Sequence, residues 1–299
     1  MSVGSRVALP RRIWIYWLQG EHAAPELVQR CIASWRRLNS GWDVVVLDQQ
    51  NYRRYADPGI AEEGFNQLGI PMRSDLLRLA LLERYGGVWV DATVLCVRPL
   101  DHFIHAYVSG SGWFAFSRSR GERLVSSWFL AAIPRHPIVR RWRQRLCDGL
   151  ALYAAPVRHP ARSRLLHKLL RELLRLHPRL TRLWLRPAVA RQAGRYPYFL
   201  MHYSFADLLA VDAEVRELWR LTPQIDNRGC KFLSRMAARS APPAAVAADR
   251  LQQSFDLFKL SHKSQALRVV QEGSWLAAVY AYVEGGGGVE IGADRAPDL

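Results

Sequence analysis

Apolar and polar residues follow one another in the N-terminal part of the chain in a pattern that predicts a strand, a helix and a second strand. The run IWIYWL, Ile13 to Leu18, is apolar and aromatic, which is typical of a buried strand. Helical spacing of apolar residues follows in APELVQRCIASWRRL, with Pro25 in the first turn and a stop at 39–41. The next strand is WDVVVLD, Trp42 to Asp48. We therefore expect the opening of a parallel α/β sheet, whose ligands lie beyond the carboxyl ends of its strands.

The segment SDLLRLALLERYGG predicts a helix with Ser74 as its N-cap and a Gly-Gly pair at its end. The strand VWVD follows directly and places Asp91 at its carboxyl end. Asp75 and Arg78 stand three residues apart and share one face of the helix, so the three side chains can converge. A structural alternative stays open, in which Asp75 stabilises the helix N-terminus, Arg78 forms a surface ion pair and Asp91 caps a turn.

Further along, Gly112 to Ser117 predicts another strand, and a helix begins at Pro137. Segment 158–191 differs from the rest because it holds ten Lys or Arg residues and a single acid. On a helical wheel a leucine stripe faces a basic side, and its members are Leu165, Leu166, Leu169, Leu170, Leu173 and Leu174 opposite Arg164, Lys168, Arg171 and Arg175. The helix is interrupted at Pro178. Three interpretations stay open: an insertion packed on the domain, a helix on a membrane surface, or a patch that binds nucleic acid.

Composition narrows the class of protein. The chain has 299 residues, 49% of them hydrophobic, which favours a folded protein over a disordered one. The net charge of +16 indicates an anionic partner: nucleic acid, a phosphate-bearing ligand or a membrane surface. Four widely spaced cysteines without a CxxC pair argue against a zinc site and a disulfide scaffold, so we expect reduced cytoplasmic thiols. Without a cleavage site or a long apolar run, we expect neither export nor a membrane span.

The run SDLLRLALLERYGGVWVDATV, Ser74 to Val94, resembles the capsular polysaccharide synthesis glycosyltransferases, which are DXD-type sugar-binding transferases with a GT-A fold. Other matching pieces occur in the same order: PRRIWIYWLQG with APELVQRCIASW, WDVVVLD, SSWFLAAIPRHPIVR, YFLMHYSFADL and SHKSQAL. The resemblance covers most of residues 10–270. It implies an α/β, GT-A-like (Rossmann-like) mixed sheet flanked by helices. The domain would span 1–284 with a basic helical insertion at 158–191, and a flexible tail would span 285–299.

The same resemblance implies an enzyme, a hexosyltransferase-like glycosyltransferase of bacterial capsule or surface polysaccharide synthesis. It would move a sugar from a nucleotide-diphosphate donor, expected to be a UDP-sugar, to a glycan or lipid-linked glycan acceptor with retention of configuration. In the family, the Asp and Arg matched by Asp75 and Arg78 hold the donor sugar, and Asp91 matches the first acid of the DXD motif, so the resemblance makes these three the predicted catalytic residues. Thr93 stands in place of the second acid, the usual metal ligand, which leaves a divalent cation (Mn²⁺ or Mg²⁺) open.

Residues near both ends of the matched region extend the predicted donor site. His262 matches a late loop that closes over the diphosphate, and with Asp91 it is the candidate pair of metal ligands; Lys263 would neutralise phosphate charge. Tyr16 and Trp17 end the first strand, where a related transferase packs an aromatic on the nucleobase, and core packing is an equal alternative. The predicted donor-binding set is Tyr16, Trp17, Asp75, Arg78, Gly87, Asp91, Thr93, His262 and Lys263. His202 and Tyr203, in an apolar run, are interpreted as core residues.

Two other classes of protein compete with the enzyme. A nucleic-acid-binding protein would explain the charge, but zinc spacing and an RNA-recognition signature are both missing from the sequence. A membrane-surface scaffold without catalysis would explain the basic helix alone. For an enzyme with a lipid-linked acceptor, residues Arg162 to Arg186 would contact an anionic surface, placing the protein peripherally on the inner face of the cytoplasmic membrane.

Overall fold

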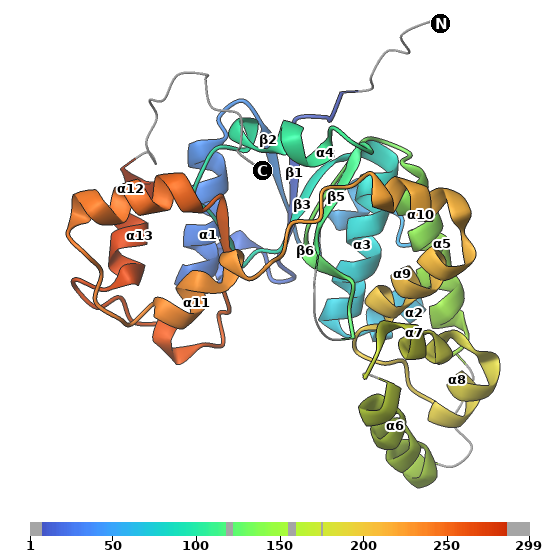
Figure 1. Cartoon of the computed structure of the whole chain (residues 1–299). Coiled ribbons are helices and arrows are strands. Elements are labelled where there is room, and N and C mark those ends of the chain that lie inside the picture. Colours follow the sequence, from blue (N-terminus) through green and yellow to red (C-terminus); the bar gives the residue numbers. More distant parts are fainter. Residues whose placement is uncertain (1–7, 118–121, 155–159, 175, 286–299) are drawn as a thin grey trace, which may run out of the picture. The chain divides into compact units, whose positions relative to one another are not determined.

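The computed structural model describes residues 8–117, 122–154, 160–174 and 176–285 (Figure 1). The chain divides into two compact units. The larger comprises the N-terminal residues through Gly20, Asp43–Asp91 and His105–Asn227, and the smaller comprises Glu21–Trp42, Ala92–Ile104 and the residues from Arg228. The predicted single domain over 1–284 stays a prediction. The predicted tail, 285–299, lies outside the described residues apart from its first glycine.

A five-stranded mixed sheet forms the centre of the larger unit, in the order β2-β1-β3-β6-β5. The strands are β1 Arg12–Tyr16, β2 Asp43–Leu47, β3 Gly87–Val90, β5 Trp113–Ser117 and β6 Val125–Ala132. β1 pairs in parallel with β2 and β3, whereas β6 runs antiparallel to β3 and β5. The carboxyl ends of β1, β2 and β3 therefore share one edge with the start of β6. This mixed sheet flanked by helices confirms the predicted α/β class, as a GT-A-like fold requires.

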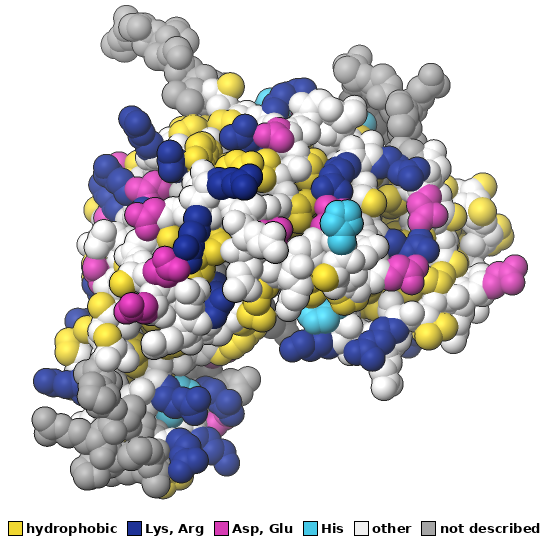
Figure 2. Space-filling model, turned by 180° about the vertical axis from the view of Figure 1, so that it is seen from behind, with side chains coloured by type: hydrophobic (Ala, Val, Ile, Leu, Met, Phe, Trp, Pro, Cys, Tyr) yellow, Lys and Arg dark blue, Asp and Glu magenta, His cyan; other side chains and the backbone are white. Residues whose placement is uncertain are grey.

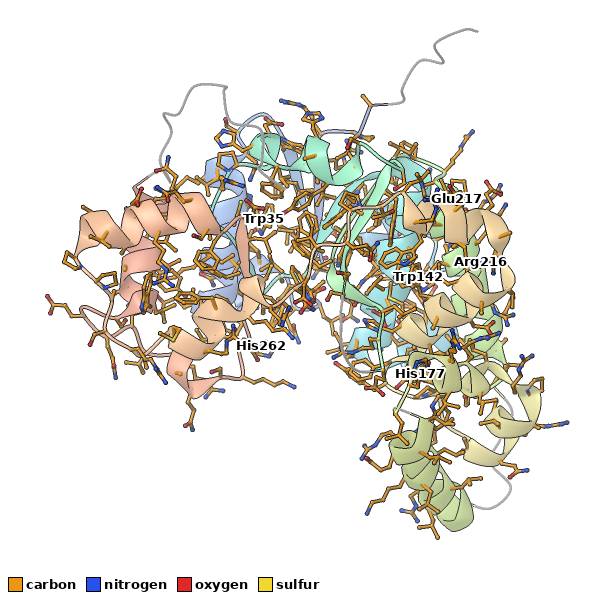
Figure 3. The ribbon with its side chains drawn as sticks, viewed as in Figure 1. Trp35, Trp142, His177, Arg216, Glu217 and His262 are labelled. Carbon is orange, nitrogen blue, oxygen red and sulfur yellow. The ribbon has the colours of Figure 1, made fainter. Side chains whose placement is uncertain are left out.

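Three long helices pack on one side of this sheet. α3, Ile70–Tyr85, contacts β1, β3 and β6, and α5, Pro137–Ala151, and α9, Leu200–Val211, pack behind it. Trp142 of α5 (Figure 3) is fully buried, and its indole N–H donates to the carbonyl of Met201 at 2.8 Å. The predicted strands and the predicted helix from Pro137 are confirmed. β6 was not predicted, because SSWFLAA is buried on both faces and lacks the alternation that marks a half-buried strand.

The start of α3 corrects one prediction. Ser74 is not the N-cap, because the helix begins at Ile70, one turn earlier, after Gly69. Pro71 explains the earlier start, since proline lacks the N–H that the first turn leaves unpaired and its fixed φ suits a helix. Ser74 thus lies inside the helix, and its hydroxyl accepts a hydrogen bond from Arg78. Asp75 is not at the helix N-terminus either, which removes the structural role considered for it.

A glycine pair joins α3 to β3. Gly87 has φ +92°, and a Cβ there would lie 2.5 Å from the carbonyl oxygen of Arg12. Only glycine permits this close approach of β3 to β1. The tight connection fixes the register of the strand that ends at Asp91.

The basic segment, which we call the insertion, is helical and belongs to the larger unit, and its status as an insertion stays a prediction. It comprises α6 Pro160–Leu174, α7 Pro178–Thr181, a 3₁₀ helix Arg182–Leu185 and α8 Pro187–Ala193; positions 158 and 175 lie outside the described residues. Leu174 and Trp184 pack against Tyr203 of α9. Asp207 of α9, 1% exposed, accepts hydrogen bonds from Arg145 and from Arg182 of the insertion. The insertion is therefore anchored to the sheet-bearing unit through buried contacts.

The smaller unit is built on a two-stranded antiparallel pair, β4 Val94–Cys96 and β7 Leu257–Lys259. α1, Glu26–Leu38, covers β4, and the indole N–H of Trp35 (Figure 3) donates to the carbonyl of Val94 at 2.7 Å. Of the four cysteines, Cys31, Cys96 and Cys230 are buried and Cys147 is half-buried. Within the described ranges no helix is long and apolar enough to span a bilayer. The remaining α-helices are α2 Glu62–Gln67, α4 Ile104–Val108, α10 Ala213–Arg220, α11 Phe232–Met236, α12 Ala244–Ser254 and α13 Trp275–Glu284.

Candidate active site

Arg78 is the centre of a polar cluster in the larger unit, where α3 passes the carboxyl end of β3. Its guanidinium lies 3.1 Å from the carboxylate of Asp75 and 3.2 Å from that of Asp91. It also donates to the hydroxyl of Ser74 and to the carbonyl of Ser127, both at 2.9 Å. The structure thus brings together the three residues whose convergence was predicted from their spacing.

Asp91 is held at the sheet edge by the strands beside it. Its backbone N–H donates to the carbonyl of Trp128 on β6 at 2.9 Å, and the indole N–H of Trp89 donates to its carboxylate at 3.2 Å. The guanidinium carbon of Arg78 lies 5.1 Å from the centre of the Trp89 ring, within range of a cation–π contact. The Asp91 side chain keeps 28% of its surface exposed, whereas those of Asp75 and Arg78 keep 9% and 5%. Asp91 is therefore the member of the cluster that a ligand can reach.

Asp75 has an unusual protonation behaviour because of its burial. Desolvation raises the pKa of its carboxyl group to about 7, although the charge of Arg78 lowers it and that of Asp91 raises it further. One guanidinium faces two carboxylates. When Asp75 is protonated, the positive charge of Arg78 balances the negative charge of Asp91. When Asp75 ionises, the three side chains carry one net negative charge in a largely buried site.

The structure brings Tyr16 to the same edge but not Gly87. Trp14 pairs with Trp89, so Tyr16, two residues on, ends β1 level with Asp91. The Tyr16 phenol is 6% exposed, its oxygen has no hydrogen-bond partner among the described residues, and burial raises its pKa to about 12. Trp17 is half-buried just beyond. Gly87 begins β3, at the opposite end of the strand from Asp91, so its role is structural in this geometry.

The remaining predicted donor residues belong to the smaller unit. Thr93 is buried, 8% exposed, and its hydroxyl accepts a hydrogen bond from the ammonium group of Lys259 at the end of β7. His262 (Figure 3) is half-buried and Lys263 is exposed on the turn that follows β7. Lys259 was missed from the sequence, where a lone lysine after two apolar residues carries no signal.

The hydroxyl of Thr93, at the position of the second acid of a DXD motif, is poorly suited to hold a divalent cation. Within the part of the chain that the structure describes, no three His, Cys, Asp or Glu side chains gather as a metal cluster. Hard cations require oxygen ligands with available lone pairs. The Thr93 hydroxyl instead faces an ammonium group, whose positive charge opposes a second cation at that position. Asp91 and His262 stay predicted metal ligands that no observation supports.

His202 and Tyr203 are core residues, as interpreted from the sequence. They are 7% and 2% exposed on α9. The Tyr203 hydroxyl donates to the carboxylate of Glu122 at 2.7 Å. These contacts fix α9 and give neither side chain a place in the Arg78 cluster.

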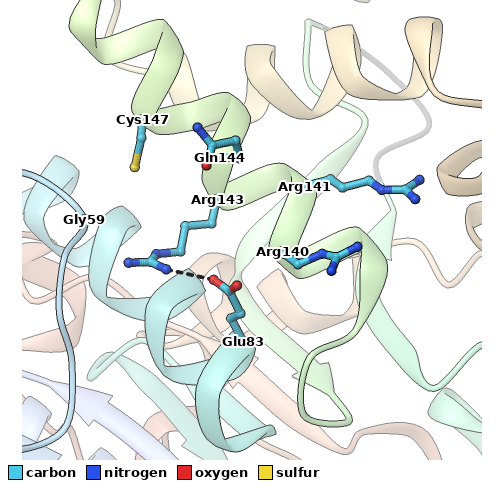
Figure 4. A pocket seen from close by; sticks show the side chains of 7 residues that line it. All are labelled: Gly59, Glu83, Arg140, Arg141, Arg143, Gln144 and Cys147. Atoms are coloured by element: carbon cyan, nitrogen blue, oxygen red, sulfur yellow. Dashed lines mark hydrogen bonds and ion pairs between the residues drawn. The ribbon is translucent and has the colours of Figure 1, made fainter.

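A surface hollow of about 370 Å³ lies between α5 and the end of α3 (Figure 4), and we call it the arginine hollow. Arg143 there pairs with Glu83 at 2.9 Å and donates to the carbonyl of Asp57 at 2.8 Å, while Arg141 pairs with Asp212 at 2.7 Å. Its arginines are largely committed to ion pairs and it shares no residue with the Arg78 cluster. We therefore do not interpret the arginine hollow as a candidate active site.

Two known proteins that are similar in sequence to this chain are named as glycosyltransferases. The chain is 29% identical over 202 residues to the O-glycosyltransferase braB of Annulohypoxylon truncatum, covering 60% of this chain and 46% of that protein. It is 29% identical over 180 residues to the glycosyltransferase afumC of Aspergillus fumigatus, covering 50% and 44%. The chain thus spans about half the length of the curated relatives it matches.

Two solved structures are also similar to this chain. The PaToxG glycosyltransferase matches with a TM-score of 0.37 and 12% identity, over 71% of this chain and 75% of that one. The ligand-free glycosyltransferase domain of the YGT toxin matches with a TM-score of 0.41 and 9% identity, over 87% and 88%.

The family itself is identified by a sequence model described as capsular polysaccharide synthesis protein, which matches residues 5–156. That match spans half of the chain and contains β1, α3, β3 and β6. It therefore includes the whole Arg78 cluster, and the chain belongs to the capsular polysaccharide synthesis protein family.

Proposed function

We propose that this protein is a glycosyltransferase that moves a sugar from a nucleotide-diphosphate sugar, expected to be a UDP-sugar, to a glycan or lipid-linked glycan in capsule or surface polysaccharide synthesis. The observation that carries the proposal is the Arg78 cluster, which fixes the reachable carboxylate of Asp91 at the carboxyl edge of the sheet. Ligands of open α/β sheets bind at this edge. Family membership and the names of the relatives point to the same activity.

The cluster suits the binding of a sugar whose hydroxyl groups need fixed acceptors. Two donors hold one oxygen of Asp91, from Arg78 and from Trp89, so its carboxylate is oriented before a ligand arrives. Asp75 and Arg78 are too buried to present much surface to a sugar, and we infer that they position the donor by fixing Asp91. Trp89 and Ser127 join them as positioning residues.

The carboxyl end of β1 suits the nucleotide. Tyr16 lies level with Asp91, and its buried phenol oxygen has no hydrogen-bond partner among the described residues. A hydrogen bond to a ligand would offset the free-energy cost of burying this hydroxyl group. Trp17 is half-buried beside it and offers an aromatic surface for a base. These features support a nucleotide donor.

We propose transfer with retention of configuration. The acceptor hydroxyl attacks the anomeric carbon on the face from which the phosphate departs, and its proton passes to the leaving phosphate. Asp91, as an anion near the sugar, stabilises the positive charge that develops on the ring. The described cluster offers no second reachable carboxylate that would serve as a nucleophile, since Asp75 is buried and paired.

The first test is donor turnover. Purified protein is incubated with a panel of nucleotide sugars, and slow release of free nucleotide diphosphate from one of them is expected, at least about tenfold above a no-enzyme control. NMR of the glycosylated product is expected to give the anomer of the donor. Absence of release across the whole panel would count against a glycosyltransferase, and an inverted product would exclude only the retaining mechanism.

An anionic membrane surface is the proposed partner of the insertion. The leucine stripe of α6 is divided: Leu170 and Leu174 pack toward Trp184, whereas Leu165, Leu169 and Leu173 are about 60% exposed. Figure 2 shows Lys and Arg side chains gathered over this lobe, where Arg164, Lys168 and Arg171 are exposed. Apolar side chains flanked by cations suit an interface of anionic lipid. A lipid-linked acceptor would bring the enzyme to the inner face of the cytoplasmic membrane.

Vesicle sedimentation tests this partner. Replacing Leu165, Leu169 and Leu173 by Ser is expected to lower binding to phosphatidylglycerol-containing vesicles by about tenfold or more, because exposed leucines lose little in the fold but much in lipid. The matched control replaces Val246 and Val269, 55% and 66% exposed elsewhere, and should bind normally. Unchanged binding of the leucine variant would refute the membrane role, and binding to RNA instead would favour the nucleic-acid alternative.

A further inference from the structure

Residue 93 stands two positions after Asp91, where a DXD motif has its second acid, and the fold places a lysine directly against it. Thr93 and Lys259 lie on neighbouring strands of the smaller unit, since Val94 pairs with Lys259 and the backbone N–H of Leu260 donates to the carbonyl of Thr93 at 2.9 Å. The Lys259 ammonium donates to the Thr93 hydroxyl. The backbone ladder fixes both residues, so the contact belongs to the fold.

The chemistry of this pair opposes a metal ion. An acid at position 93 would offer a charged oxygen to a divalent cation, but a hydroxyl is neutral and this one accepts a hydrogen bond from an ammonium. In a DXD motif the second acid would bind a divalent cation. Here the ammonium group of Lys259 places a positive charge next to residue 93 instead. The fold supplies a positive charge at this position from its own side chain.

The surroundings of Lys259 are also cationic. Further cations follow Lys259 along the chain. Lys263 lies on the turn after β7 and is exposed, and Arg268 follows in the same smaller unit. Such a group of cations suits an anion, and a diphosphate carries the charge and the oxygen acceptors to match it.

We propose that Lys259 takes the place of the divalent cation of DXD-type transferases, so that this protein binds and turns over its donor without metal. The inference rests on the proposed function and specifies the donor diphosphate as the ligand of Lys259. As the bond between the anomeric carbon and the phosphate oxygen breaks, its electron pair goes to that oxygen. The Lys259 ammonium stabilises the charge, and the oxygen then receives the proton of the acceptor hydroxyl.

The experiment measures UDP binding by calorimetry and donor turnover, each in EDTA and in Mn²⁺. The wild-type protein is expected to bind UDP and to turn over donor in EDTA within about twofold of the values in Mn²⁺. Lys259→Met is expected to weaken UDP binding and to lower turnover by about a hundredfold, the usual cost of removing one group that stabilises a developing anion. Arg220→Met, which removes an exposed cation of α10 that has no place in the proposed donor or membrane sites, is the matched control and should change neither.

A double variant separates a chemical role of Lys259 from a structural one. Thr93→Asp combined with Lys259→Met restores the second acid and removes the competing ammonium, and we expect turnover that Mn²⁺ stimulates at least about tenfold. If EDTA abolishes UDP binding or turnover of the wild-type protein and Mn²⁺ restores it, the inference is wrong while the glycosyltransferase proposal stands. UDP binding in neither condition would overturn the inference as well, and turnover of no donor would remove the proposed function itself.

Discussion

Asp91→Asn is expected to abolish sugar transfer, a fall of at least about a thousandfold, while the protein stays folded. The substitution keeps the size of the side chain but removes its charge, and with it the stabilisation of positive charge on the sugar ring. Because the Asp91 side chain is 28% exposed, a neutral amide is tolerated there at little cost in stability. The measurement is the rate of nucleotide release, with the melting temperature and circular dichroism recorded in parallel.

Glu83→Gln is the matched control for this variant. Glu83 lies on the same helix as Asp75 and Arg78, and its carboxylate pairs with Arg143 in the arginine hollow, away from the proposed site. The same change from acid to amide there should leave turnover within about twofold. Near-normal turnover by Asp91→Asn would show that the carboxylate has been assigned the wrong role, and equal losses in both variants would point to a general loss of structure.

Local patterns were enough to predict the convergence of Asp75, Arg78 and Asp91. The spacing of three residues sets a common helix face, and the glycine pair forces β3 to follow α3 at once, so both elements reach the same edge. The sequence pattern places the start of α3 one turn late, because Ser74 is a common N-cap residue, whereas Pro71 also suits the first turn of a helix. The position of a helix end is set by a few such residues and is therefore hard to predict, whereas the face of a helix is set by the spacing of many residues and is easier to predict.

Contacts between distant segments could not be predicted in this way. Trp89 is visible in the sequence only as an apolar strand residue, yet its indole N–H holds Asp91. Lys259 lies 166 positions from Thr93, and only the pairing of β4 with β7 brings them together. The leucines of α6 were predicted as one stripe, but the partners on the 3₁₀ helix and α9 that divide it are set by tertiary packing.

The second large effect is expected from Arg78→Met, which leaves two carboxylates without their cation. Removing one partner of a buried ion pair costs about 3 to 5 kcal/mol, and Arg78 also donates to Ser74 and Ser127. We therefore expect a loss of this size in the free energy of unfolding, measured by urea denaturation, together with loss of turnover. Arg143→Met, which breaks a half-exposed pair with Glu83, is the control and should cost about 1 kcal/mol or less.

The effect of Arg78→Met should depend on pH through Asp75. Burial raises the pKa of Asp75 to about 7, so the folded state retains a proton that the unfolded state has released, and the stability from this group is lost as the pH rises toward and through 7. At about pH 5 Asp75 is protonated and neutral, so the loss of the Arg78 charge does not affect it. At about pH 8 Asp75 is ionised and its charge is no longer compensated, so the destabilisation caused by Arg78→Met should be larger at the higher pH by about 1 kcal/mol. Adding Asp75→Asn to Arg78→Met removes the ionisable group and should abolish that difference. An equal loss at both pH values would mean that Asp75 is not the group that Arg78 compensates.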